Sequence, residues 1–241
     1  MIEVAANDGI VTIKMVRPEG KNALNLEMVR KMRVALAEAT DARVVVFKSG
    51  IPGYFSVGMD LVSLEAGIKG GATTPELHRS VAEYVDLLKD IVGMRCLTIA
   101  AVGGMAVGGG VDLLASCDLA IASDDAAFSI AQLRKGIFPL TTSGVVIPRI
   151  GQRAFLYWML TGQNYSAKKA RKIGLVNQVV KRGRLDARID QLTQQIIGYD
   201  ADVLALGIEA LRVGPNLTPM DRLSHLGVLL TLNCQIPRDN K

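Results

Sequence analysis

The stretch of sequence best suited to chemistry joins a glycine-rich turn to a carboxylate. It runs from Leu97 to Ser123, and an uncharged, largely β-branched strand leads into a turn with five glycines, Gly103, Gly104, Gly108, Gly109 and Gly110. We expect a short helix to begin near Val111. Glycines let a ligand approach the backbone, and N–H groups in a first helical turn have no intrahelical partner. Because Asp112 follows directly, the sequence predicts an anion site with an acid or base beside it.

A second glycine turn offers another main-chain donor. Residues 55–61 read Phe-Ser-Val-Gly-Met-Asp-Leu. The glycine, Gly58, would let the backbone turn so that the N–H group of Met59 faces a cleft instead of a neighbouring strand. The chain therefore contains two turns whose N–H groups could meet at one negatively charged oxygen.

Structural roles account for the same residues. A glycine-rich turn after a strand is more often tight packing than catalysis, and Asp112 could simply cap a helix and complement its dipole. The spacing matches neither a dinucleotide fingerprint nor a phosphate-binding loop, since it is not G-x-G-x-x-G and no G-K-[ST] follows.

The elements that must position these turns begin with a strand, a helix and a strand. Residues 10–16 alternate apolar and polar and predict a strand. After Asn25, a plausible helix cap, apolar residues recur every three or four positions up to Ala39. Arg43 to Phe47 is a short apolar run, as expected for a strand buried on both faces of a parallel sheet. This βαβ order predicts an α/β fold.

The remaining pattern extends this order along the chain. We expect a helix from Thr74-Pro75 to Gly93, strands at 97–102, 118–123 and 175–180, and a turn at 124–129. We expect a loop at 136–144 that could close over a ligand, and helices at 151–160 and, capped by Ser166, up to Gly174. Helical patterns at 185–197, 203–213 and 220–232 predict a helical tail without a linker that would mark an independent domain.

Composition limits the class of protein. The 241 residues suffice for one sizeable α/β domain, and 49% apolar with 21% charged residues is typical of a soluble globular chain. Three cysteines suggest neither a disulfide framework nor a metal site. The uncharged run from Cys96 to Val111 is shorter than the roughly 20 residues that span a bilayer. With no secretory pattern at the first residues, we expect a cytoplasmic protein.

The formal charge of +5 is modest, but one region is strongly basic. Seven basic residues lie within a short span, namely Lys168, Lys169, Arg171, Lys172, Lys181, Arg182 and Arg184. Such a cluster could meet a phosphorylated ligand or an acidic partner, although a solvated surface is at least as plausible. We expect no nucleic-acid binding, because aromatic residues make up only 5% and none interleave this cluster.

In order along the chain, these motifs resemble the enoyl-CoA hydratase/isomerase family, the crotonase superfamily. Arg17-Pro18 with residues 22–25 looks like the family's early coenzyme A turn, and residues 55–61 match its F-[SA]-x-G-x-D-[LI] motif. The glycine-rich turn is similar to the second donor site. Residues 160–162, Ala170 and residues 174–176 match the downstream pattern.

The resemblance implies a crotonase-like spiral of ββα units over residues 1–183 and a C-terminal helical region over 184–241 for trimerisation or as a lid. It implies an acyl-CoA substrate, with coenzyme A as part of the substrate and no cofactor or metal, and a homotrimer or hexamer. The N–H groups of Met59 and Gly109 would form the oxyanion hole. Further substrate or coenzyme A contacts would come from Lys21, Ala23, Leu24, Val57, Gly58, Asp60, Leu61, Gly108, Phe138 and Leu140.

The acid/base positions depart from the family's hydratases, which resemble one another in carrying two glutamates. This chain has Asp112 at the first position and Gln132 at the second. An amide exchanges no proton near neutral pH, although it can hold a water or a carbonyl. We therefore expect Asp112 and Gln132 to be the catalytic residues of an isomerase, decarboxylase or dehydratase of fatty acid metabolism. Asp112 would be the acid/base, acting alone or with a group that the sequence does not identify.

Three other functions are consistent with the sequence. Loss of the second acid would also fit an acyl-CoA binder without catalysis. Residues 128–130 and 136–139 more weakly resemble relatives that modify polyketide intermediates on acyl carrier proteins. In such an enzyme the basic cluster could dock the carrier protein. A serine hydrolase would need Ser56 or Ser129 beside His78 or His225, and no G-x-S-x-G elbow is present.

Overall fold

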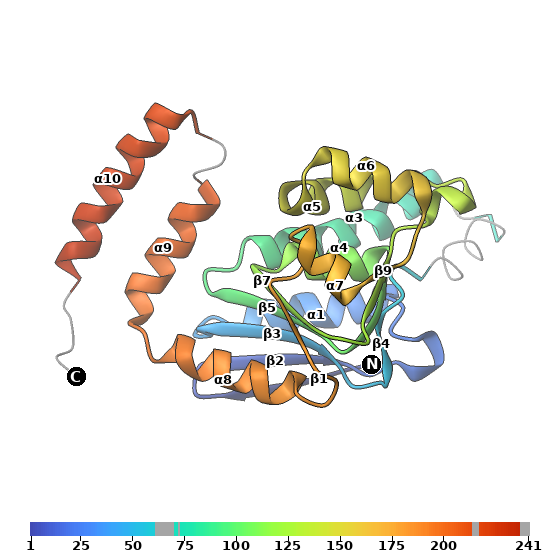
Figure 1. Cartoon of the computed structure of the whole chain (residues 1–241), viewed down its shortest axis with the longest axis horizontal. Helices are drawn as coiled ribbons and strands as arrows, with labels where there is room; N and C mark the ends of the chain where they lie inside the picture. The colour runs from blue at the N-terminus through green and yellow to red at the C-terminus, as the bar shows by residue number, and fades with distance from the viewer. Residues whose placement is uncertain (61–69, 72, 214–216, 237–241) are drawn as a thin grey trace.

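The computed structural model describes residues 1–60, 70–71, 73–213 and 217–236 of the chain (Figure 1). Two β-sheets organise this part, and the larger has six strands in the order β1-β2-β3-β5-β7-β10. Its strands are β1 (Ile2–Asn7), β2 (Ile10–Met15), β3 (Val44–Ser49), β5 (Leu97–Val102), β7 (Leu119–Ser123) and β10 (Gln178–Val180). All neighbours are parallel except the β1–β2 hairpin.

The smaller sheet has four strands in the order β4-β6-β8-β9. They are β4 (Gly53–Ser56), β6 (Gly104–Val107), β8 (Ala127–Ser129) and β9 (Tyr165–Ser166). The first three are parallel, and β9 runs antiparallel to β8. Each of β3, β5 and β7 in the large sheet is followed in the chain by a strand of the small sheet and then by a helix. The predicted α/β fold built of ββα units is therefore confirmed.

The helices in chain order are α1 (Leu26–Glu38), α3 (Thr74–Val92), α4 (Gly109–Ser116), α5 (Leu140–Ile150), α6 (Gln152–Thr161), α7 (Ala167–Lys172), α8 (Leu185–Ile197), α9 (Ala201–Val213) and α10 (Pro219–Gln235), with short 3-10 turns η1 (Pro18–Gly20) and η2 (Gln132–Lys135). Asn25 caps α1 by accepting a hydrogen bond from the N–H of Met28, as its position predicts. Ser166 caps α7 in the same way through the N–H of Lys169.

The large sheet is covered on both faces, which explains the continuous apolar run of β3. Val45 and Phe47 belong to the main core beneath α1 and α3, whereas Val44 and Val46 pack with Ile189 of α8. Since side chains alternate along a strand, both faces need apolar residues. The helix α8 thus belongs to the core, although it lies beyond the predicted boundary at residue 183.

The last two helices extend away from the sheets side by side (Figure 1). No side chain of α10 is buried among the described residues, and several apolar side chains of this pair are exposed, namely Leu211, Val213, Met220, Leu223, Val228, Leu230 and Leu232. The predicted role of residues 184–241 in trimerisation or as a lid stays a prediction.

Several local predictions were wrong. A strand, β6, lies inside the predicted glycine turn, and β8 occupies part of the predicted turn 124–129. The short helix expected near Val111 is confirmed as α4, which begins at Gly109. The helix α5 begins at Leu140, inside the predicted loop. Strands of three or four residues leave little pattern in a sequence, because distant partners decide whether they pair. The cap of α3 is Thr73, whose capping box with Glu76 puts Thr74 inside the helix.

Candidate active site

Three parallel strands of the small sheet end at the same edge, and the segments after them carry the predicted site. Val57 to Met59 follow β4, Gly108 and Gly109 follow β6, and η2 with Gln132 follows β8. Because β6 pairs with both β4 and β8, these three segments are neighbours although the sequence separates them by more than twenty residues each. The fold thereby brings both glycine turns and the amide together.

The first turn leaves the N–H group of Met59 without a strand partner. Leu24 pairs with this segment, since its N–H donates to the carbonyl of Gly58 at 2.7 Å and its carbonyl accepts from the N–H of Asp60 at 3.1 Å. In a parallel bridge of this kind the N–H of the residue between points to the other side. Gly58 has φ +89°, and a Cβ there would lie 2.6 Å from the Gly109 nitrogen, so this position requires glycine.

The second turn places Gly109 against the first. A Cβ atom on Gly109 would lie 2.9 Å from the Met59 nitrogen and 2.8 Å from the Tyr84 hydroxyl oxygen. Gly109 is the first residue of α4, so its N–H has no intrahelical acceptor. Within the described part of the chain, neither the Met59 nor the Gly109 N–H donates a hydrogen bond. Two unused main-chain donors therefore lie side by side.

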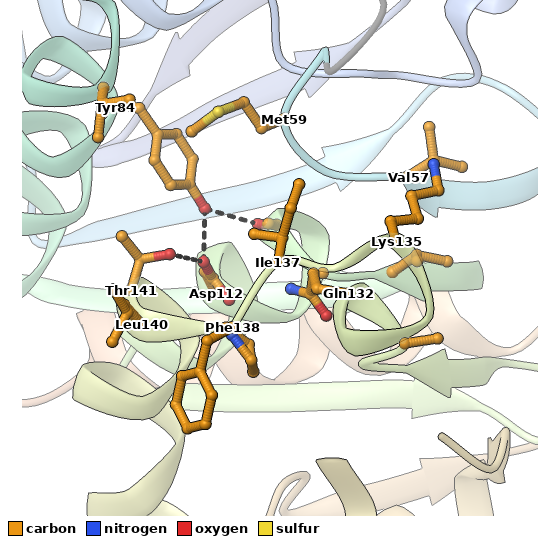
Figure 2. Close-up of a pocket in the computed structure, with 16 residues that line it drawn as sticks. Val57, Met59, Tyr84, Asp112, Gln132, Lys135, Ile137, Phe138, Leu140 and Thr141 are labelled. Atoms are coloured by element: carbon orange, nitrogen blue, oxygen red, sulfur yellow. Dashed lines mark hydrogen bonds between the residues drawn. The ribbon is translucent and has the colours of Figure 1, made fainter. Parts of the chain in front are cut away.

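Asp112 is a buried carboxylate held on one oxygen. Its side chain is in the first turn of α4, and its Oδ2 accepts hydrogen bonds from Tyr84 at 2.8 Å and from Thr141 at 3.0 Å (Figure 2). Oδ1 makes no hydrogen bond of acceptable geometry with a described residue. Burial raises the pKa of the Asp112 carboxyl, and the hydroxyls of Thr142, Tyr84 and Thr141 only partly oppose it. A carboxylate whose pKa is raised is a stronger base.

Gln132 stands next to the glycine turn. A Cβ on Gly108 would lie 3.0 Å from its Nε2, which donates a hydrogen bond to the hydroxyl of Thr142 at 3.3 Å. Its Oε1 is buried and lacks a hydrogen-bond partner among the described residues. An unused acceptor of this kind is a place for a donor group of a ligand or for a water molecule.

A cavity of about 320 Å³ lies over these groups. Figure 2 shows the side chains of Asp112, Tyr84, Thr141 and Gln132 around it, with apolar groups from the loop before α5. Three apolar side chains of this wall are largely exposed, namely Ile137 and Phe138 of the loop and Leu140 at the start of α5. The cavity thus combines few polar groups with an apolar wall, as ligand sites commonly do.

The structure places the predicted site residues in two groups. Eight line the cavity, namely Asp112, Gln132, Met59, Gly109, Val57, Gly108, Phe138 and Leu140. The five others that the structure describes do not line it. Leu24 lies in the core, the Lys21 ammonium lies over the Tyr54 ring, and Asp60 forms an ion pair with Arg17 at 2.9 Å. Ala23 is buried, Gly58 shapes the first turn, and Leu61 lies outside the described residues.

Sequence reasoning missed Tyr84, and it placed Thr141 in a segment over the ligand without its contact to Asp112. Tyr84 is an apolar-stripe position of α3, and Thr141 lies in the segment predicted as a loop. The one available signal was chemical, because a buried tyrosine hydroxyl needs a hydrogen-bond partner and a helix stripe supplies none.

The serine candidates have other partners. Ser56 Oγ donates to the carbonyl of Asn22 at 2.7 Å and accepts from the N–H of Gly58. In the described ranges, no hydrogen bond joins Ser56 or Ser129 to a histidine, and His78 is exposed on α3. This geometry gives no support to a serine hydrolase. Across the same ranges, no helix combines the length and the hydropathy that crossing a bilayer requires.

Comparison with known proteins points in one direction. A sequence model of the family described as "Enoyl-CoA hydratase/isomerase" matches residues 5–214. The chain is 31% identical over 206 residues to a mitochondrial protein of Rattus norvegicus named enoyl-CoA hydratase domain-containing protein 3, covering 83% of this chain and 66% of that protein. It is 29% identical over 220 residues to the 4-chlorobenzoyl coenzyme A dehalogenase-2 of Arthrobacter sp, covering 90% and 79%.

Solved structures show the same likeness. A crystal structure of an enoyl-CoA hydratase from Mycobacterium smegmatis superposes with a TM-score of 0.92 at 26% identity, covering 98% of this chain and 91% of that one. Among the curated relatives, some are named as mitochondrial, so the cytoplasmic location expected from the sequence stays a prediction.

Proposed function

Because the chain belongs to the enoyl-CoA hydratase/isomerase family, we propose that it acts on an acyl-CoA thioester by stabilising its enolate. The thioester oxygen would bind between the N–H groups of Met59 and Gly109, and Asp112 would transfer the proton. The observation that supports this best is the adjacency of two unused N–H donors beside a buried carboxylate on the same cavity.

The proposed chemistry begins with the α-carbon of the acyl group. In isomerisation and dehydration, Asp112 removes a proton from that carbon, and the electron pair of the broken C–H bond forms the enolate, whose charge moves to the thioester oxygen. Oδ2 already accepts two hydrogen bonds, whereas Oδ1 is buried and accepts none of acceptable geometry from a described residue, so Oδ1 would take the proton once a bound acyl chain brings it into contact. Each oxyanion donor is worth roughly 3–4 kcal/mol of barrier in enzymes where one was removed.

The single carboxylate sets the reaction class. Gln132 holds a ligand or water but transfers no proton, so we propose isomerisation, decarboxylation or dehydration instead of hydration by two acids. In isomerisation, Asp112 removes a proton from one carbon and returns it to another. In decarboxylation, the electrons of the broken C–C bond form the enolate as carbon dioxide leaves, and protonated Asp112 delivers a proton to the α-carbon. In dehydration, Asp112 removes the α-proton and passes it to the departing β-hydroxyl, which leaves as water.

We further propose assembly as a trimer or hexamer through residues 184–241. The exposed apolar side chains of α9 and α10 support this, since a large group of exposed apolar side chains is typical of a protein–protein interface. A carrier-protein partner rests only on the basic cluster, whose seven side chains are all exposed, and stays a prediction.

Proton exchange tests the proposed function directly. The protein is incubated with a saturated acyl-CoA of four to eight carbons in heavy water, and deuterium at the α-carbon is followed by mass spectrometry. We expect exchange far above the rate without protein. Binding of the acyl-CoA without exchange would instead identify a non-catalytic binder and overturn the proposal.

Replacing the amide by an acid tests the reaction class. Gln132→Glu is expected to gain hydration of a short enoyl-CoA by about 100-fold, because it supplies the second proton-transfer group. Thr142 can donate to the new carboxylate where it now accepts from the amide. The measurement is loss of the ultraviolet absorbance of the conjugated thioester.

The matched control for this variant is Gln152→Glu, which makes the same charge change at an exposed position of α6. No gain in Gln132→Glu at any chain length would mean that this cavity is not arranged to activate water.

A further inference from the structure

We propose that Tyr84 is a positioning residue for Asp112, and that it fixes the carboxylate and sets the pH range in which it acts as base. The proposal rests on the proposed function and adds the partner that the sequence left unidentified. The helices α3 and α4 meet at this pair of side chains, and Tyr84 is buried there.

The Tyr84 hydroxyl lies where the reacting groups converge. It donates to Asp112 Oδ2 at 2.8 Å and lies 3.4 Å from the carbonyl oxygen of Gly109 (Figure 2). It is also 2.8 Å from the position of a Cβ on Gly109, the residue whose N–H is the proposed donor. One hydroxyl thus touches the base and borders the oxyanion turn.

The hydrogen bond from Tyr84 fixes which oxygen of Asp112 accepts from the neighbouring hydroxyls. With Tyr84 and Thr141 both donating to Oδ2, rotation of the carboxylate would break two hydrogen bonds in a buried place. Oδ1 is buried and makes no hydrogen bond of acceptable geometry in the described chain, so the two hydrogen bonds on Oδ2 are what hold the carboxylate in this orientation. Tyr84 therefore orients the base through its partner oxygen.

Few charged groups of the described residues lie near Asp112, so a hydrogen bond from a neutral hydroxyl has a large effect on the pKa of its carboxyl. Tyr84 is the titratable group of α3 that lines the cavity, and α5 contributes the hydroxyls of Thr141 and Thr142. Arg149 of α5 binds the carbonyls of Ala115 and Cys117 at the other end of α4. From η2, Lys135 lines the cavity and is exposed.

Burial raises the pKa of Asp112, and the Tyr84 hydrogen bond counteracts part of that. Burial and the Asp112 charge also raise the pKa of Tyr84 well above its usual value, so its hydroxyl stays protonated and remains a donor at neutral and mildly alkaline pH. Tyr84 thus keeps the carboxylate ionised at a lower pH than burial alone would allow.

Tyr84→Phe tests the proposal because it removes only the hydroxyl. In the heavy-water exchange assay we expect the maximal rate to fall about 10-fold to 100-fold with little change in KM, as loss of a hydrogen bond to a charged group predicts. We also expect the acidic limb of the pH–rate profile to move to higher pH. A purely structural role would leave that limb in place.

The second readout needs no activity. Free energies of unfolding are measured from pH 4 to pH 9 for the wild type, Tyr84→Phe, Asp112→Asn and the double variant. In Tyr84→Phe the decline of stability with rising pH should extend to higher pH, and with Asp112→Asn in the background that difference should vanish. Tyr157→Phe, an exposed tyrosine of α6, is the matched control and should leave both readouts unchanged.

The outcomes separate the two proposals. If the wild type exchanges no α-proton, the proposed function fails, and the unfolding series still decides whether Tyr84 controls Asp112. If the wild type exchanges and Tyr84→Phe keeps both the pH–rate limb and the pH dependence of unfolding, the role of Tyr84 is overturned.

Discussion

Asp112→Asn is expected to lower the rate of α-proton exchange by about 100-fold to 10,000-fold, the range that a general base contributes. The asparagine Oδ1 can still accept from Tyr84 and Thr141, so the cavity should keep its shape and its affinity for an acyl-CoA. Exchange is measured by mass spectrometry and affinity by calorimetry. Exchange at the wild-type rate would remove Asp112 from the mechanism.

The same variant is expected to be more stable than the wild type at neutral pH. Since the folded-state pKa of Asp112 is raised, the native protein binds more protons than the unfolded chain between the ordinary carboxyl pKa and the raised one. Stability contributed by this group is therefore present at low pH and falls as pH rises through that range. The asparagine does not titrate, so this fall disappears, with a gain of about 1.4 kcal/mol per pKa unit.

Urea unfolding at pH 4 and pH 8 measures this gain. The two proteins should differ little at pH 4, and the variant should be the more stable at pH 8. If the variant were less stable than the wild type at pH 8, burial of the Asp112 charge would not lower the free energy of unfolding, and this prediction would be wrong.

Gly109→Ala is the second change expected to have a large effect. The new Cβ would lie 2.9 Å from the Met59 nitrogen and 3.2 Å from the Gly58 Cα, which are backbone atoms that cannot move aside alone. The two turns must separate, so we expect exchange to fall by about 100-fold to 1,000-fold, as for loss of one oxyanion donor. Overpacking should also cost roughly 1–3 kcal/mol of stability.

Gly144→Ala is the matched control, because nothing lies within 4 Å of a Cβ at that exposed position of α5. It should leave exchange unchanged and raise stability by roughly 0.5–1 kcal/mol. Wild-type exchange in Gly109→Ala, measured together with urea unfolding, would contradict the proposed use of these turns.

The sequence predicts best those features that depend on residues close together in the chain. The helix α8 was predicted with its observed bounds, and the caps Asn25 and Ser166 are as expected, because a cap depends on a few adjacent residues. The α/β class follows from apolar periods along single segments.

Features decided by distant segments could not be predicted. The hydrogen bond from Tyr84 to Asp112 joins residues 28 apart, and the ion pair of Asp60 with Arg17 joins residues 43 apart. The short strands β6 and β8 exist because β4 and β9 pair with them, which a window of sequence does not contain. Hence the motif identified Asp112 but not the group that holds it.

Only one oxygen of Asp112, Oδ2, accepts hydrogen bonds from Tyr84 and Thr141, and for the proposed mechanism this has a stereochemical consequence. A base that reaches the acyl chain through one fixed oxygen, from one side of the enolate plane, takes and returns its hydrogen on the same face. In a double-bond shift the hydrogen would move suprafacially, and a part of it would be carried from one carbon to the other before solvent replaces it. In this mechanism the configuration of the labelled product depends on the hydroxyl groups of Tyr84 and Thr141, which orient Asp112 without reacting themselves.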